Sequence, residues 1–217
     1  MIKSKKGIAQ ILEDARLLIQ GALHQPLVLQ EVAKYRYSEK DIRNAQKLLD
    51  RAVALQSDKT SKYGKQLGAS DQYKKDQAEA WDLYSYHYQL AKLACRNESG
   101  LQKRLQLEVP RKRNMAAWME QSRYFYTELL QLPQVYEAMA VSAEELAQAQ
   151  AMQEAVADSR RNFKSSQGEA QLATQARNIA FKELEEWTRR FRKVARLALE
   201  ENDQLLEGMG ITVRSKV

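Results

Sequence analysis

The chain aligns with itself, and this internal repeat constrains its fold more than any other feature of the sequence. Residues 5–33 match residues 112–140 without a gap, with eight identities in 29 positions. After three additional residues in the first copy, residues 37–107 match residues 141–211 with sparser identities but with the same order of features. We therefore predict a tandem duplication whose two copies pack together.

The two copies, at 1–109 and 110–217, are both predicted to be all-α. The whole chain holds only 8 Gly and 3 Pro, so few residues interrupt helices, and it is rich in strong helix formers. Apolar residues at helical spacing follow Gly7, and the matching helix of the second copy follows Asn114. A proline break and a short helix come next in both copies.

The long helices are predicted to begin at a capping signal. Ser38 and Ser142 each precede an acidic residue by three positions, a pattern in which each side chain satisfies a free backbone N–H group of the other residue. Gly64 and Gly168 come later in the pattern, and we predict a turn or a helix end at each. A second long helix follows, so each copy is predicted to be a helical-bundle unit with two long antiparallel helices.

One stretch, WTRRFRKVARLALE at residues 187–200, places five basic side chains within ten positions. An apolar face at helical spacing runs beside them, formed by Leu184, Trp187, Phe191, Val194 and Ala198. Glu185 precedes Arg189 by four residues and Glu186 precedes Arg190 by four, an order that favours ion pairs along a helix. We interpret the basic side chains as a solvated helix face, with a phosphate-contacting surface as the alternative.

An aromatic stripe distinguishes the matching helix of the first copy. Trp81, Tyr84 and Tyr88 lie beside the apolar face that includes His87, where the second copy has mostly polar residues. A helix with so wide an apolar face is expected to be covered on two sides, so we predict that the stripe packs between the copies. The alternative is a partner or ligand surface lined by Trp81, Tyr84, His87 and Tyr88. For His87 alone, a buried and hydrogen-bonded core position is favoured over a ligand role.

Basic residues recur just before the first helix of each copy. Lys5 and Lys6 precede one helix, and Arg111, Lys112 and Arg113 precede the other. Cations oppose the dipole at a helix N-terminus, but together with free backbone N–H groups they would suit a bound anion. These five residues are therefore candidate anion contacts, and a solvated tail and linker is the alternative.

No catalytic or metal-binding pattern occurs in the sequence. Di-iron helical bundles need Glu three residues before His, and neither His24 nor His87 has one. Glycine-rich phosphate loops, zinc-protease motifs and nucleophile elbows do not occur either. We predict that the protein is not an enzyme and uses no cofactor and no metal.

The sequence also carries expectations about the compartment. The single Cys95 allows neither an internal disulfide nor a zinc cluster. Glu13 and Asp14 interrupt what would be the apolar region of a signal peptide, and no apolar run approaches the roughly 20 residues of a membrane helix. We expect a cytoplasmic protein without a membrane partner.

The C-terminal run from residue 168 to residue 211 resembles the signature of a family of uncharacterised bacterial all-helical proteins. The positions that fit the pattern are Gly168, Ala170, Gln171, Ala173, Thr174, Arg177, Ala180, Leu184, Trp187, Phe191, Ala195, Arg196, Leu205, Leu206, Gly210 and Ile211. The first copy lacks recognisable Ala-Thr and Trp-x-x-x-Phe elements. Since the family has no assigned activity, the resemblance implies the fold and no mechanism.

These features predict a non-enzymatic helical binding or scaffold protein, with a protein partner or self-association through apolar helices. The alternative is a weak binder of nucleic acid or another anionic ligand through the basic residues near the joint between the copies. The formal net charge of +7 permits nucleic-acid binding without requiring it.

Overall fold

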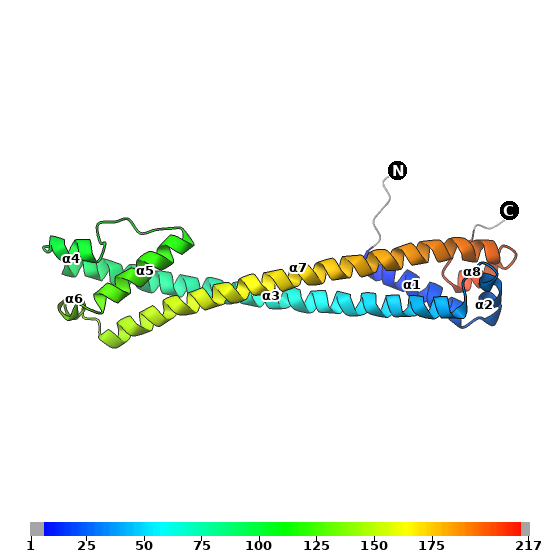
Figure 1. Cartoon of the computed structure of the whole chain (residues 1–217), viewed down its shortest axis with the longest axis horizontal. Coiled ribbons are helices and arrows are strands. Elements are labelled where there is room, and N and C mark those ends of the chain that lie inside the picture. Colours follow the sequence, from blue (N-terminus) through cyan, green and yellow to red (C-terminus); the bar gives the residue numbers. More distant parts are fainter. Residues whose placement is uncertain (1–6, 214–217) are drawn as a thin grey trace. The chain divides into compact units, whose positions relative to one another are not determined.

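The computed structural model describes residues 7–213, and every regular element in this range is a helix, which confirms the all-α prediction. Figure 1 labels them along the chain as α1 (Ile8–Leu23), α2 (Pro26–Ala33), α3 (Glu39–Ala94), α4 (Ser99–Arg104), α5 (Met115–Leu129), α6 (Pro133–Ala138), α7 (Ala143–Ala198) and α8 (Asp203–Gly208). Within residues 7–213, no helix combines the length and the apolar character that a bilayer span requires.

The order and the bounds of the helices repeat. The starts of α1 and α5, at Ile8 and Met115, are 107 residues apart, and α2 and α6 start at the same separation. Helices α3 and α7 are both 56 residues long and start 104 residues apart, as do α4 and α8. These are the two offsets of the sequence alignment. The predicted repetition of helix order is therefore observed, while the duplication itself stays a prediction.

Hydrogen bonds at the first turn explain where the long helices begin. The Ser38 N–H donates to an Asp41 carboxylate oxygen at 2.9 Å, and the Asp41 N–H donates back to Ser38 Oγ at 3.3 Å. Ser142 and Glu145 form the same reciprocal pair at 2.7 and 3.1 Å, so both predicted capping signals are confirmed. The hydrogen bonds from Ser38 and Ser142 lower the pKa of the two carboxyl groups, because they stabilise the ionised form.

The helix ends repeat as well. Arg36 and Ala140 both have a positive φ, of 66° and 54°, and Gln106 and Gly210 form a second matching pair at 54° and 70°. After each of the four, the next residue donates its N–H to the carbonyl five residues back, at 2.9–3.2 Å. This left-handed closure satisfies carbonyl groups that a helix end would otherwise leave without a partner.

The predicted breaks at Gly64 and Gly168 are wrong, because α3 and α7 run through them without interruption. Glycine inside a helix costs only about 1 kcal/mol relative to alanine, and strong helix formers on both sides outweigh that cost. A Cβ added at either glycine would have no heavy atom within 4 Å, so no close contact requires glycine there. Each copy therefore has one long helix and not two.

The described chain divides into two compact units whose boundary lies inside the two long helices. Unit 1 comprises the described residues up to Tyr63 and those from Glu169 onward, and unit 2 comprises Gly64–Gly168. These units differ from the predicted division into 1–109 and 110–217. The physical reason is the continuity of α3: since it does not turn back at Gly64, its first half packs against the second half of α7.

Within each unit, the segments of α3 and α7 are antiparallel. In unit 1, Arg51 pairs with Glu183 at 3.3 Å and Lys62 with Glu169 at 2.6 Å, so the numbering rises on one helix as it falls on the other. In unit 2, the amide of Gln153 donates to the carbonyl of Ala80 at 3.4 Å, and the rings of Tyr73 and Phe163 stack with their centroids 6.1 Å apart.

Each unit has its own apolar core, built from both copies of the repeat. The core of unit 1 combines α1, α2, α8 and the facing segments of α3 and α7, and its large members include Leu18, Ile19, Ile42, Leu49, Leu184 and Phe191. The core of unit 2 combines α5, α6, the chain after α4 and the other segments of the long helices, and its large members include Tyr84, Leu107, Trp118, Phe125, Tyr126 and Leu129. Burial of these side chains is the main contribution to stability.

We expect Gly64→Ala and Gly168→Ala each to raise the free energy of unfolding by about 0.5–1 kcal/mol, because alanine favours a continuous helix. Urea denaturation followed by circular dichroism measures the change. Gly21→Ala is the matched control: its Cβ would lie 2.8 Å from Met209 Cγ and 3.0 Å from the Gly208 carbonyl oxygen, so it should destabilise the protein. Loss of stability in Gly64→Ala would contradict the continuous helix.

Candidate functional site

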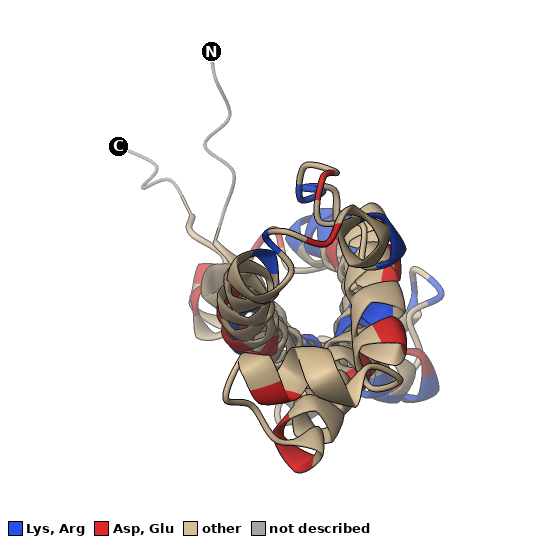
Figure 2. Ribbon diagram, turned by 90° about the vertical axis from the view of Figure 1, so that its left-hand side faces the viewer, with Lys and Arg blue, Asp and Glu red and all other residues tan. Residues whose placement is uncertain are grey.

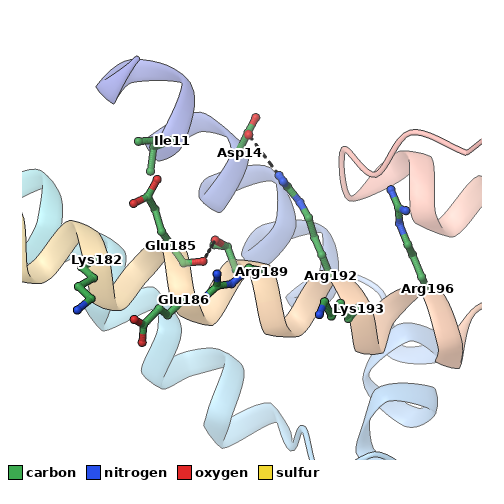
Figure 3. Close-up of a pocket in the computed structure, with 10 residues that line it drawn as sticks. Ile11, Asp14, Lys182, Glu185, Glu186, Arg189, Arg192, Lys193 and Arg196 are labelled. Atoms are coloured by element: carbon green, nitrogen blue, oxygen red, sulfur yellow. Dashed lines mark hydrogen bonds and ion pairs between the residues drawn. The ribbon is translucent and has the colours of Figure 1, made fainter. Parts of the chain in front are cut away.

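A groove of about 780 Å³ lies between α1 and α7 in unit 1. Helix α1 contributes Ile11 and Asp14 to it. Helix α7 contributes the remaining lining residues, which are Lys182, Glu185, Glu186, Thr188, Arg189, Arg192, Lys193 and Arg196 (Figure 3). The volume is within the range of about 300–1,000 Å³ that is typical of ligand sites.

The amphipathic pattern of residues 184–198 explains why charged side chains line this groove. Leu184, Phe191 and Ala195 are buried in the core of unit 1, and Trp187 is partly buried against it. The opposite face of α7 then has to be polar. The predicted apolar face is confirmed at Leu184, Trp187, Phe191 and Ala198, but the core of unit 1 contains Ala195 and not the predicted Val194. Part of the basic face is the wall of a groove.

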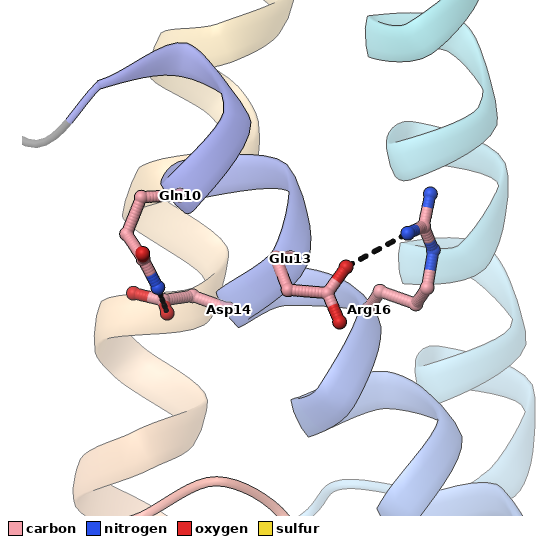
Figure 4. A network of polar contacts seen from close by, with 4 residues as sticks. All are labelled: Gln10, Glu13, Asp14 and Arg16. Atoms are coloured by element: carbon pink, nitrogen blue, oxygen red, sulfur yellow. Dashed lines mark hydrogen bonds and ion pairs between the residues drawn. The ribbon is translucent and has the colours of Figure 1, made fainter.

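An ion pair joins the two walls of the groove. Arg192 extends from α7 toward Asp14 on α1, and their closest charged atoms are 3.3 Å apart (Figure 3). Asp14 also accepts a hydrogen bond of 2.6 Å from the Gln10 side chain on its own helix, beside the Glu13–Arg16 ion pair (Figure 4). Both members of the Asp14–Arg192 pair are shielded from solvent, with 17% and 30% of their side chains exposed. This pair connects the two walls, which also pack together through the core of unit 1.

The other cations of the groove are less engaged. Of the two predicted acid-first pairs, Glu186–Arg190 forms at 3.7 Å, but no ion pair joins Glu185 to Arg189 among the described residues. In the same part of the chain, Lys193 has no ion-pair partner either, and both Arg189 and Lys193 are exposed. With Arg196 they follow the spacing i, i+4, i+7, which places three cations on one helix face.

This arrangement is suited to binding an anionic group. A guanidinium group donates hydrogen bonds in a planar fork that matches a carboxylate or a phosphate. The one hydroxyl in the lining, that of Thr188, donates to the Glu185 carbonyl at 3.0 Å, so it is held by its own helix. The groove thus offers cations to an anion and no activated nucleophile.

The aromatic stripe is part of the core of unit 2. Tyr84, His87 and Tyr88 are buried, and the Tyr84 ring contacts Phe125 and Tyr126 of α5 at centroid distances of 5.5 and 6.2 Å. Because α3 and α5 come from different copies, the predicted packing between copies is confirmed. The alternative of an open surface lined by these three residues is ruled out, since their burial leaves no surface to line.

Trp81 lies at the edge of this aromatic core. It is partly buried, with its ring centroid 5.4 Å from that of Trp118, and the Arg111 guanidinium lies 5.9 Å from its ring. Of the four residues proposed for a partner surface, only Trp81 is therefore within reach of solvent. Trp118, which the sequence analysis did not single out, is the fully buried member of the pair.

His87 is the buried, hydrogen-bonded histidine that the sequence predicts. Its Nδ1 lies 3.2 Å from the hydroxyl of Tyr126. Burial lowers the pKa of His87, and the nearby Glu145 carboxylate opposes this effect. Burial also raises the pKa of Tyr84 and Tyr126 above the ordinary tyrosine value. All of these groups are therefore held in their neutral forms at neutral pH.

Of the five candidate anion contacts, the structure describes Arg111, Lys112 and Arg113. Lys5 and Lys6 lie outside the described residues. Arg111 lies over a tryptophan ring, while the Lys112 and Arg113 side chains are exposed.

The start of α5 is also capped from within the chain. The side chain of Asn114 accepts hydrogen bonds from the N–H groups of Ala116 and Ala117 at 3.0 and 3.4 Å. The free N–H groups that were expected to attract an anion are thus partly satisfied by the chain itself.

Among the described residues, no group of three His, Cys, Asp or Glu side chains is placed to hold a metal ion. No family model, no curated protein and no solved structure matches the chain. The resemblance to a bacterial helical family therefore stays a prediction.

We expect Trp118→Ala to lower the free energy of unfolding by about 3–5 kcal/mol, the range for truncating a large buried aromatic side chain. Trp81→Ala should cost clearly less, because Trp81 is only partly buried. Urea denaturation of the two variants and the parent measures the difference. A Trp118→Ala protein as stable as its parent would be incompatible with its place in the core.

The lowered pKa of His87 makes stability depend on pH. The unfolded chain, with an ordinary histidine pKa of 6.5, binds the proton more readily than the folded protein. The stability that neutral His87 contributes to the folded protein is therefore complete above about pH 6.5 and decreases as the pH falls below that value. His87→Phe, which copies Phe191 at the equivalent position, should flatten the decrease between about pH 7 and pH 5. Urea denaturation across this range tests it, and equal slopes in both proteins would refute it.

Proposed function

We propose that the protein is a non-enzymatic binding or scaffold protein, and that the groove between α1 and α7 holds an anionic part of its partner. The observation that most supports this proposal is the exposed row of Arg189, Lys193 and Arg196 beside the Asp14–Arg192 pair. Exposed cations on a groove wall that an ion pair fixes are a preorganised site for an anion.

The repeated architecture supports the scaffold part of this proposal. Helix order, helix bounds and left-handed helix ends all recur at offsets of 104 or 107 residues, as expected of a tandem duplication. Each compact unit combines helices from both copies. A duplicated fold of this kind presents two related but differently charged surfaces, which suits a protein that binds rather than reacts.

Nucleic acid is the weaker candidate for the anionic partner. Asp14, Glu185 and Glu186 line the groove together with the cations, and a phosphate backbone would meet these acids as well. Figure 2 shows Lys and Arg mixed with Asp and Glu along the helices. The exposed Lys112 and Arg113 at the joint favour a weak nucleic-acid contact there at most.

The test is affinity capture from cell extract by the full chain, read out by mass spectrometry. The double variant Arg189→Glu with Lys193→Glu should lose its specific partner, with enrichment reduced about tenfold or more, because charge reversal repels an anion. The matched control is Lys40→Glu with Lys47→Glu, which reverses two exposed charges on α3 outside the groove. The same partners at the same enrichment with the parent protein and both double variants would contradict the proposal.

A further inference from the structure

An apolar stripe runs along one side of α7 in unit 1. Its positions follow the spacing i, i+3, i+7, i+10 and i+14, and they are Glu169, Leu172, Ala176, Ile179 and Glu183. This spacing places them on one face of the helix. Leu172 and Ile179 are 66% and 56% exposed, and Ala176 between them is half-buried. The stripe therefore presents its apolar centre to solvent.

An ion pair closes each end of the apolar stripe. Lys62 on α3 pairs with Glu169 at 2.6 Å, and Arg51 on α3 pairs with Glu183 at 3.3 Å. The stripe thus lies on a side of α7 that adjoins α3. Each end carries one acid and one cation, so a molecule that covers the stripe meets no net charge at either end.

Helix α1 packs on a different side of α7. There Arg192 pairs with Asp14 across the groove. Arg192 follows Ala176 by sixteen residues, which corresponds to about 160° around the helix at 3.6 residues per turn. The groove and the apolar stripe are therefore on nearly opposite sides of α7, and a molecule bound to the stripe would leave the groove open.

The repeat shows that a long helix of this kind does not require the apolar stripe. The equivalent positions of α3, 104 residues earlier than Leu172, Ala176 and Ile179, are occupied by Gly68, Gln72 and Lys75. These three residues are also exposed, and α3 is as long and as continuous as α7. Exposed apolar side chains that lie together, unlike scattered ones, mark sites of protein association.

The order of residues in the stripe is symmetric about Ala176. A large aliphatic residue lies four positions before it and another three positions after it, and a glutamate lies seven positions away on either side. A second α7 lying antiparallel, with Ala176 against Ala176, would therefore place Leu172 against Ile179 twice, as a self-complementary interface requires. The small alanine side chains allow the two helices to approach closely at the twofold axis.

The charges at the ends fit the same arrangement. The antiparallel contact brings the Lys62–Glu169 pair of one copy beside the Arg51–Glu183 pair of the other. Each end of the interface then holds two cations and two acids, so no charge there lacks an opposite charge nearby.

We propose that the protein forms a twofold symmetric dimer in which the apolar stripes of two copies pack antiparallel. The stripe spans about 21 Å of helix, which is short for an interface, so the dimer is reversible. The inference concerns a different surface from the groove and does not rest on the proposed function. Since the stripe and the groove lie on different sides of α7, the dimer presents two open grooves.

Sedimentation velocity of the full chain at concentrations from about 1 to about 200 µM tests the dimer. We expect the sedimentation coefficient of the parent to rise from that of a monomer to that of a dimer. Leu172→Gln with Ile179→Lys should weaken dimerisation at least about tenfold, because it replaces the apolar centre with polar side chains. The matched control is Leu93→Gln, which changes a leucine that is 69% exposed outside the stripe and should dimerise as the parent does.

Disulfide cross-linking tests the position of the twofold axis. In a Cys95→Ala background, which removes the single native thiol, Ala176→Cys should form a covalent dimer under mild oxidation, because the residue faces its own copy. Gln72→Cys, at the equivalent position of α3, is the control and should stay unlinked. Circular dichroism checks that each variant is folded.

Three results would overturn the proposal. The first is a parent protein that stays monomeric over the whole concentration range, which would leave the stripe to a different protein. The second is a Leu172→Gln, Ile179→Lys variant that dimerises as tightly as the parent, or a Leu93→Gln variant that loses dimerisation equally. The third is equal cross-linking through positions 176 and 72. None of these results bears on the partner captured through Arg189 and Lys193, so the proposed function is tested separately.

Discussion

The continuity of α3 and α7 is the constraint on which the rest of the structure depends. Each helix passes through a glycine that could have ended it, so neither copy can fold back on itself into a closed bundle. The apolar faces of the first half of α3 and the second half of α7 then cover each other, and the short helices close each core. Each core consequently contains side chains from both copies, and neither copy could bury its apolar residues alone.

Because the two units share one plan, the differences between them point to function. At equivalent positions, unit 2 has Trp81, Tyr84 and Tyr88, and unit 1 has Glu185, Thr188 and Arg192. The aromatic version is covered by the chain that joins the copies, and burial of the rings stabilises that cover. Covering the charged surface of unit 1 would stabilise the protein less, since cations lose hydration when they are buried. These three differences thus accompany the contrast between a packing surface in unit 2 and an open groove in unit 1.

Local signals predicted the helix starts, but contacts between distant residues decided the units and the groove. Ser38 with Asp41 and Ser142 with Glu145 act within one turn, so the sequence reveals them directly. The predicted breaks at Gly64 and Gly168 are wrong because one glycine costs a helix little free energy compared with what a long run of helix formers and a partner helix contribute. The ion pair of Asp14 with Arg192 joins residues on α1 and α7, and no periodicity signals such a pair. The basic stretch at 187–200 is evident in the sequence from its charge, but the groove that part of it lines depends on the packing of α1 against α7.

The Asp14–Arg192 pair also determines which charges of the groove are available to a ligand. The two side chains largely neutralise each other, so the attraction for an anion comes from Arg189, Lys193 and Arg196. Arg192 keeps hydrogen-bonding capacity beyond its bond to Asp14, because a guanidinium has five N–H donors. Neutral backbone groups can use this capacity without separating the ions. The groove therefore combines a neutral centre, at the Asp14–Arg192 pair, with a cationic rim that attracts an anion.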